Sequence, residues 1–81
     1  MTDKNITDLT LLLMYLTAWT EPVLQDPGRE VVRTWKGYSV KALYDLHIEG
    51  LIDALGNGKS ALITEAGREK ARQLAKKHLG K

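Results

Sequence analysis

Cysteine is absent from the 81-residue sequence, and proline occurs only twice. Without cysteine the chain has no disulfide, no thiol nucleophile and no cysteine zinc site. The low proline content and 43% hydrophobic residues are typical of a globular domain and not of a disordered segment. Because the chain is long enough for one core and too short for two, we expect a single domain over residues 1–81, in a reducing cytoplasm.

A long apolar run is also lacking. The longest, Leu9–Trp19, has about half of the roughly twenty residues that a membrane-spanning helix needs. A signal peptide begins with basic residues and ends in small ones, whereas Asp3 and Asp8 lie before this run and bulky Trp19 ends it. We therefore expect an internal helix and no membrane partner.

Basic side chains are the minority among the charged residues of the first part of the chain, and acidic side chains are the minority in the last part. Residues 1–58 hold five basic and eight acidic side chains, a balance of −3, and residues 59–81 hold seven basic and two acidic ones, a balance of +5. Any attraction to phosphate groups is therefore expected from the C-terminal quarter.

The first predicted helix begins at a cap on Asn5 or Thr7, ends near Trp19, and is apolar on two faces. One face holds four leucines at helical spacing, namely Leu9, Leu12, Leu13 and Leu16. The other carries Leu11, Tyr15 and Ala18. Because one core covers only one face, the helix is either central or shared with a second copy. The small size of the chain favours a homodimer with Leu11, Tyr15 and Ala18 at its interface.

Residues 27–36 permit two interpretations. Asp26 as a cap and Pro27 at the first helical position favour a helix over Pro27–Lys36 that Gly37 ends. A run of β-forming residues, Val31, Val32, Thr34 and Trp35, favours a strand instead. We expect the helix, which would form a tight helix-turn-helix with the next element.

The remaining elements have clear boundaries. Ser39–Glu49 is predicted to be a helix that Gly50 ends, and Thr64 caps a last helix that extends to about Leu79. Leu51–Leu55 and Ser60–Thr64 are short apolar runs around an Asn-Gly turn, the strongest short hairpin signal. The expected fold is mainly α with a short β-hairpin, a winged helix-turn-helix in the order α-α-α-β-β-α. Gly67 would permit close backbone approach in the last helix.

Two resemblances support this expectation. Gly50-Leu51-Ile52, a hairpin and then Leu62, Thr64, Gly67 and Ala71 resemble the second half of winged-helix regulators of the MarR and PadR type. The leucine-rich first helix and the motif Arg33-x-Trp35-Lys36-Gly37-Tyr38 are similar to a family of small bacterial domains of unknown function. The first resemblance implies a DNA-binding scaffold, and the second implies a fold but no activity.

The expected function is non-catalytic binding of double-stranded DNA through backbone contacts. The candidate contacts are Lys36, Lys41, Lys59, Arg68 and Arg72. We do not expect the helix over residues 39–49 to contact base edges in the major groove. Asp45 would neutralise the charge of Lys41, and Glu49 would repel phosphates. The alternative is a protein interaction or dimerisation module that uses the scaffold without nucleic acid.

Trp35 and Tyr38 flank Lys36 and Gly37, which fits either a platform for stacked bases or core anchors, and we expect core anchors. Trp19 is likewise expected in the core or at the dimer interface. His47 and His78 are far apart in the sequence and form no metal-ligand spacing. No nucleophile, carboxylate pair or phosphate-binding loop is visible. We therefore expect no enzyme, metal, cofactor or small-molecule ligand.

Overall fold

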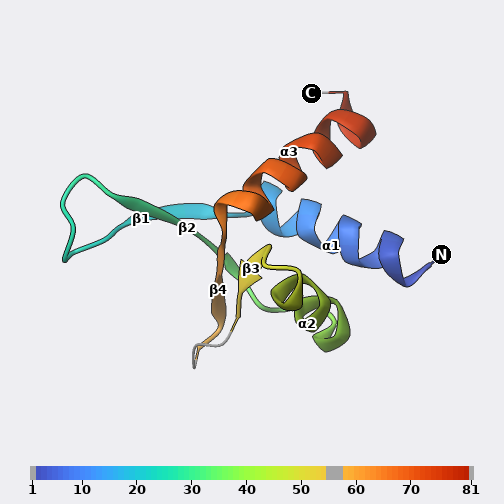
Figure 1. The fold of residues 1–81 in the computed structure, drawn as a ribbon, viewed down its shortest axis with the longest axis horizontal. Helices are drawn as coiled ribbons and strands as arrows, with labels where there is room; N and C mark the ends of the chain where they lie inside the picture. Colours follow the sequence, from blue (N-terminus) through green and yellow to red (C-terminus); the bar gives the residue numbers. More distant parts are fainter. Residues whose placement is uncertain (1, 55–57, 81) are drawn as a thin grey trace.

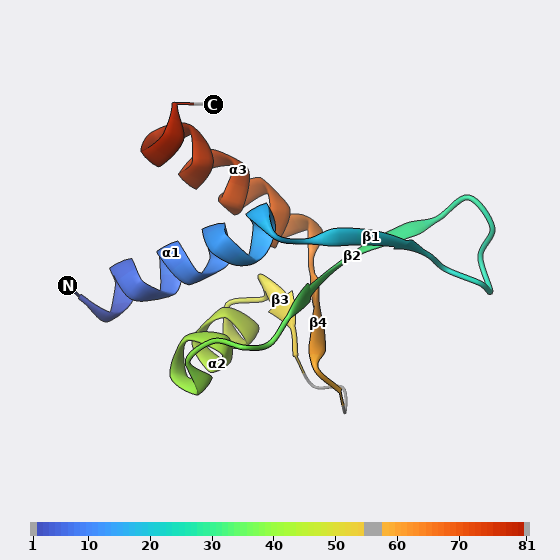
Figure 2. The same cartoon turned by 180° about the vertical axis from the view of Figure 1, so that it is seen from behind.

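A computed structural model of the chain describes residues 2–54 and 58–80. Within them the elements are α1 (Asp3–Leu16), β1 (Trp19–Pro22), β2 (Glu30–Trp35), α2 (Val40–Ile48), β3 (Ile52–Asp53), β4 (Ser60–Ile63) and α3 (Glu65–Leu79). The strands form one antiparallel sheet in the order β1-β2-β4-β3, with the helices on one side of it (Figures 1 and 2). The order α-β-β-α-β-β-α is that of a mixed α/β domain.

The prediction of an α-α-α-β-β-α winged helix is therefore wrong. Residues 27–36, expected to form a helix, contain strand β2, and Trp19–Pro22 forms the partner strand β1. Asp26 and Pro27 lie in the turn between them, where the amide of Arg29 donates to the carbonyl of Asp26 and Gly28 has a φ of 90°. Because Gly28 readily adopts this positive φ, Asp-Pro-Gly forms a turn here and does not begin a helix.

The second half of the chain follows the prediction more closely. Ser39 caps α2 by accepting from the amide of Ala42, and Thr64 caps α3 by accepting from the amide of Gly67. The expected hairpin is present as β3 and β4, although residues 55–57 of its turn lie outside the described residues. The N-cap of α1 is Thr2, and the expected caps Asn5 and Thr7 lie inside the helix.

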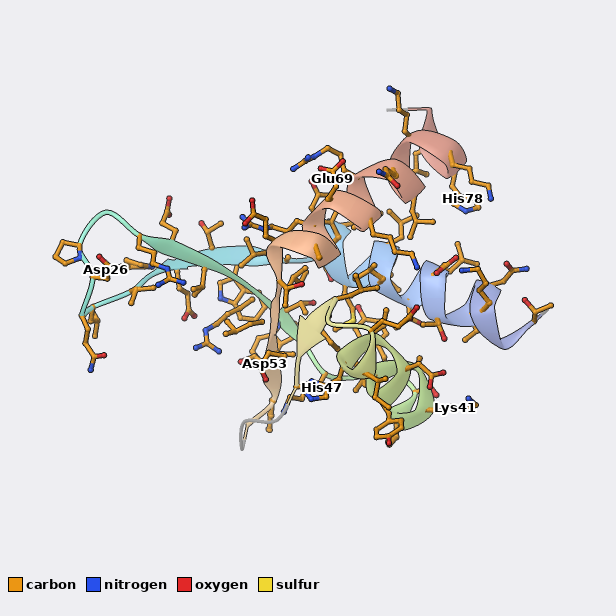
Figure 3. The ribbon with its side chains drawn as sticks, in the orientation of Figure 1. Asp26, Lys41, His47, Asp53, Glu69 and His78 are labelled. Atoms are coloured by element: carbon orange, nitrogen blue, oxygen red, sulfur yellow. The ribbon has the colours of Figure 1, made fainter. Side chains whose placement is uncertain are left out.

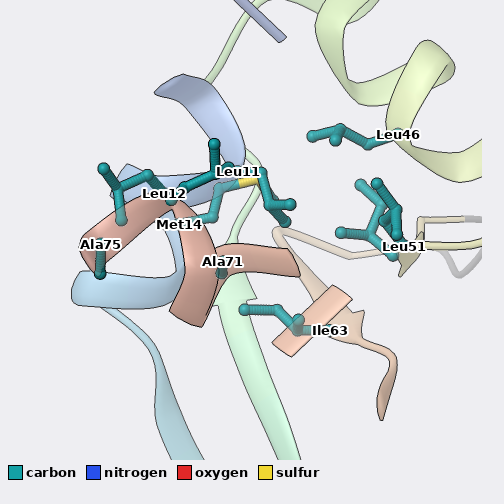
Figure 4. Packing of buried hydrophobic residues seen from close by; sticks show 10 residues of the cluster. Leu11, Leu12, Met14, Leu46, Leu51, Ile63, Ala71 and Ala75 are labelled. Carbon is teal, nitrogen blue, oxygen red and sulfur yellow. The ribbon is translucent and has the colours of Figure 1, made fainter. Parts of the chain in front are cut away.

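The core lies between the helices and the covered face of the sheet (Figure 4). It is built from buried leucine, isoleucine, methionine and alanine side chains: Leu11, Leu12, Met14, Leu46, Leu51, Ile52, Ile63, Ala71, Leu74 and Ala75. Thr34 is buried among them, and its hydroxyl donates to the carbonyl of Met14 at 3.0 Å. This bond joins β2 to the last turn of α1 and satisfies a polar group that is costly to bury alone.

At Gly67 the first turn of α3 packs directly against the backbone of Leu51, which follows α2. A Cβ atom added at Gly67 would lie 1.9 Å from the carbonyl oxygen of Leu51. That oxygen also accepts from the amide of Thr64 at 3.1 Å, just before α3 begins. The close backbone approach predicted for Gly67 is confirmed.

The hairpin of β1 and β2 extends away from the helices (Figures 1 and 2). It gives the molecule extents of 42 × 29 × 18 Å and a radius of gyration of 12.6 Å. A compact domain of this length has a radius of gyration of about 11.7 Å. The chain therefore has more surface than a closed single domain of its size requires.

Candidate interaction surfaces

The outer face of α1 is apolar and uncovered. Ile6, Leu9, Leu13 and Leu16 are 36–53% exposed, and they lie opposite the buried side chains of the same helix. These four residues, the α1 stripe, follow a spacing of three, four and three residues. That spacing places side chains in the single line along which two helices pack in a coiled coil.

The sequence predicted a dimer interface on the face of this helix that carries Leu11, Tyr15 and Ala18, whereas the structure packs that face, together with Leu12, against the core. Leu11, predicted at a dimer interface, is 0% exposed and lies in the core of the single chain. It therefore has no surface to offer a partner. Tyr15 and Ala18 are half-buried and pack against the same core.

The outer face of α2 is a second apolar surface. Val40, Tyr44 and Ile48 recur every four residues and are 62–82% exposed. Val40 and Tyr44 border a shallow hollow of about 230 Å³, whose other lining residues are Lys36, Leu43, His47 and Ala54. His47 is half-buried, and its Nδ1 accepts from the amide of Ala54 at 3.4 Å.

The face of the sheet turned away from the helices carries the two tryptophans. Cross-strand partners share a face, and the register Trp19–Arg33–Leu62–Asp53 runs across all four strands on this side. Trp35 lies two residues beyond Arg33 on the same face, and its ring centroid is 4.8 Å from that of Trp19. We call Trp19, Arg33 and Trp35 the sheet platform.

Polar contacts hold the sheet platform in place. The carboxylate of Glu21 accepts from Trp19 Nε1 at 2.9 Å and pairs with Arg33 Nε at 2.8 Å. Arg33 also donates to Ser60 Oγ at 3.3 Å, which links β1, β2 and β4. These contacts hold the Trp19 ring and the guanidinium in fixed orientations.

The expectation that Trp35 anchors the core is wrong, because its side chain is 56% exposed. As β2 is a strand, Thr34 points inward and its neighbours Arg33 and Trp35 point outward. Tyr38 does pack against the core. Trp19 lies on a strand and not on the first helix, and it is half-buried beside Trp35.

The five predicted phosphate contacts do not form one surface. Lys36 and Lys59 are brought together where the amide of Lys36 donates to the carbonyl of Lys59 at 2.8 Å. Lys41 lies on α2 (Figure 3), and its ammonium group pairs with Asp45 at 3.2 Å. Arg68 and Arg72 lie apart from these on α3.

Each arginine of α3 has a different environment. Arg72 pairs with the carboxylate of Glu69. Arg68 and Arg72 border an open groove of about 690 Å³ together with Tyr15 and Trp19. The Nε atom of Arg68 is buried without a hydrogen-bond acceptor in the described part of the chain.

Residues 2–54 and 58–80 contain no candidate metal-binding cluster and no candidate membrane-spanning helix. This range holds no cluster of three or more His, Asp or Glu side chains that is suited to a metal ion, and His47 and His78 lie well apart (Figure 3). None of its helices combines the length and hydrophobicity that crossing a bilayer requires.

Comparison with protein-family models gives a match to one family over nearly the whole chain. The model of a domain of unknown function, DUF6429, matches residues 2–81. The chain belongs to this family. No curated protein and no solved structure matches it, so the resemblance of its second half to winged-helix regulators gains no support.

In this DUF6429 domain the motif Arg33-x-Trp35-Lys36-Gly37-Tyr38 contributes side chains to both faces of the sheet. Arg33 and Trp35 build the open face, while Thr34 and Tyr38 secure β2 and the following turn to the core. Three members of the α1 stripe, Leu9, Leu13 and Leu16, were visible in the sequence as part of a line of leucines that also included the buried Leu12. The exposure of the stripe was not, because both faces of that helix are apolar.

Proposed function

We propose that this domain is a non-catalytic protein-interaction module that forms a homodimer through the α1 stripe. The observation that carries this proposal is the exposure of Ile6, Leu9, Leu13 and Leu16 in one line on the outside of α1. An apolar line of this kind on a small domain is typical of a contact surface.

The occupant of the stripe is a second copy of the chain. The stripe is centred between Leu9 and Leu13, so an antiparallel pair of α1 helices places each Leu9 against Leu13 of the other copy. The same register places Ile6 against Leu16. Antiparallel pairing also sets the helix dipoles in a favourable orientation.

Electrostatics supports self-pairing. Among the residues of α1 whose side chains the structure describes, the polar ones that flank the stripe are uncharged, namely Asn5, Thr10 and Thr17. The charged Asp8 is turned toward Lys4 and Lys70, at 3.7 and 3.3 Å, on the side of α1 that faces α3. Two copies therefore meet without repulsion, while a strongly charged partner would find no complementary charge on the stripe.

The surface area of the chain agrees with a dimer. The chain exposes 5664 Å². A compact monomer of 9.1 kDa exposes about 4,900 Å², so the excess is roughly 760 Å². The projecting hairpin and the uncovered helix faces account for this excess. A standard interface buries about 800 Å² on each partner, and the part of the excess that lies on the outer face of α1 is the part that a second copy would cover.

The test is mass by light scattering or sedimentation over a range of concentrations. We expect twice the 9.1 kDa of one chain for the wild type and the mass of one chain for Leu13→Glu. Val40→Glu is the matched control, because Val40 is an even more exposed apolar residue on the other exposed helix face. A monomeric wild type, or a dimer that survives Leu13→Glu, would refute the proposal, and loss of the dimer with Val40→Glu alone would assign the interface to α2.

Disulfide trapping tests the orientation, because the chain has no cysteine of its own. Mixing Leu9→Cys protein with Leu13→Cys protein is expected to give mainly the mixed disulfide. Homodimeric disulfides of Leu9→Cys alone would indicate parallel helices.

A further inference from the structure

An open groove lies where the end of α1, the start of β1 and the first half of α3 come together (Figures 1 and 2). Its volume of about 690 Å³ is within the range of about 300–1,000 Å³ that is usual for small-molecule sites. Arg68 and Arg72, four residues apart on α3, border it with positive charge. Leu16, Trp19 and Val32 border it with apolar surface. We call this hollow the arginine groove.

The guanidinium of Arg68 is partly buried and has no partner within the described residues. Its Nε atom is buried without a hydrogen-bond acceptor. On its other side Arg68 borders a smaller hollow whose lining includes Glu30 and Glu65, but neither carboxylate pairs with it in the part of the chain that the structure describes. A charged group that is taken out of water without a partner is costly. Arg68 also lies in the first turn of α3, where the helix dipole disfavours a cation. A bound anion would lower both costs.

The charge of the arginine groove favours an anionic occupant. The described residues that line it carry two guanidiniums and no carboxylate. Arg72 does pair with Glu69, but both side chains are more than half exposed, and such surface pairs are weak. Because a guanidinium has five N–H donors, Arg72 keeps donors for a ligand while it contacts Glu69.

We infer that the arginine groove binds a small organic acid, with the carboxylate on the two arginines and the hydrocarbon body against the apolar lining. Guanidinium groups bind carboxylates through paired hydrogen bonds. Apart from the arginines, the polar side chains of the described lining are the hydroxyls of Tyr15 and Thr20. Two hydroxyls are too few for the amides of a peptide or the oxygens of a nucleotide, whereas hydrocarbon needs no such partners.

The site goes beyond the proposed dimer and does not depend on it. Leu16 borders both the arginine groove and the α1 stripe, but the two arginines that select the ligand lie on α3. A protein that is monomeric in solution would therefore still bind the acid.

The probes are butyrate, hexanoate and octanoate, with octanamide as the uncharged match of the longest acid. Trp19 borders the groove, so intrinsic fluorescence follows each titration. The Nε–H signal of Arg68 in a proton–nitrogen NMR spectrum should shift as the carboxylate binds. Each buried methylene is expected to tighten binding by about fourfold. Octanamide is expected to bind about tenfold more weakly than octanoate, or weaker still.

Arg68→Met removes the charge and keeps a long side chain, so we expect octanoate to bind about 10- to 150-fold more weakly. Lys76→Met is the matched control, because Lys76 is an exposed cation on the same helix and does not line the groove, and its affinity should not change. Without ligand, Arg68→Met should be at least as stable as the wild type, since it replaces an unpaired and partly buried charge. Circular dichroism verifies that each variant is folded.

Four results would overturn the inference. They are absence of binding by all three acids, equal binding of octanoate and octanamide, an octanoate affinity that Arg68→Met leaves unchanged, and inorganic phosphate that binds as tightly as octanoate. Acetyl-Leu-Leu ends in the same carboxylate on a peptide. If it bound more tightly than octanoate, the groove would belong to the C-terminus of a protein chain and not to a free acid.

Discussion

Replacing Gly67 with alanine is expected to destabilise the domain although alanine is the better helix former. The new Cβ would lie 1.9 Å from the carbonyl oxygen of Leu51, 2.9 Å from its carbonyl carbon and 3.0 Å from Cγ2 of Ile63. The nearest two atoms belong to the backbone, so a change of side-chain rotamer gives no relief. The start of α3 must therefore move away from Leu51.

The size of the effect follows from three contributions. Overpacking of a tight site costs about 1–3 kcal/mol, and contact with a fixed backbone oxygen places Gly67→Ala at the upper end. Moving α3 also weakens the hydrogen bond from Thr64 to Leu51, which contributes about 1 kcal/mol. Alanine regains about 1 kcal/mol of helix propensity. The expected net loss is about 3 kcal/mol in the free energy of unfolding.

Urea denaturation followed by circular dichroism, at one fixed protein concentration, measures this loss as a lower midpoint with an unchanged slope. Gly37→Ala is the matched control, since no atom lies within 4 Å of its added Cβ and its φ is not positive. It should be neutral or slightly stabilising. If Gly67→Ala were as stable as the wild type, or more stable by the helix propensity alone, the tight junction between α3 and Leu51 would be refuted.

Two further substitutions test other contacts in the same assay. Thr34→Val removes the buried hydrogen bond to the carbonyl of Met14 while keeping the side-chain shape, so we expect a loss of about 1–2 kcal/mol, whereas Thr20→Val on the exposed part of β1 should change little. A Thr34→Val variant that is more stable than the wild type would contradict this contact. Asp8→Asn removes the carboxylate that Lys70 and Lys4 share, and we expect a loss of about 1 kcal/mol that shrinks as salt is added. Asp26→Asn, whose pair with Arg29 is exposed, is the control, and equal losses from the two substitutions would argue against a special role for Asp8.

Sequence signals predicted the structure correctly where the structure depends only on neighbouring residues. Ser39 and Thr64 each begin a helix, because a hydroxyl at the cap satisfies a free amide whatever the rest of the chain does. The requirement for glycine at position 67 was likewise visible. These features predicted α2 and α3, and the Asn-Gly pair between two apolar runs predicted the β3–β4 hairpin.

The first half of the chain was not predictable in the same way. The segment Glu30–Trp35 is short and mixes apolar with polar side chains, and it becomes a strand because β1 and the distant β4 pair with it on either side. In α1 two apolar faces compete for one core, and the position of α3 decides that Leu11 is buried and Leu13 is not. Assigning the wrong structure to β2 also hid the sheet platform, because only a strand turns Arg33 and Trp35 to the same side.

The projecting β1–β2 hairpin is a suitable site for inserting a tag into the domain. Beyond the residues of β2 that pair with β4, its end is closed by its own hydrogen bonds, including the amide of Val23 to the carbonyl of Arg29 at 2.9 Å. Such a tip should exchange its amide protons and be cut by proteases well before the core opens. An epitope or a surface-coupling peptide inserted between Leu24 and Gln25 would therefore immobilise the domain while leaving both the α1 stripe and the sheet platform accessible.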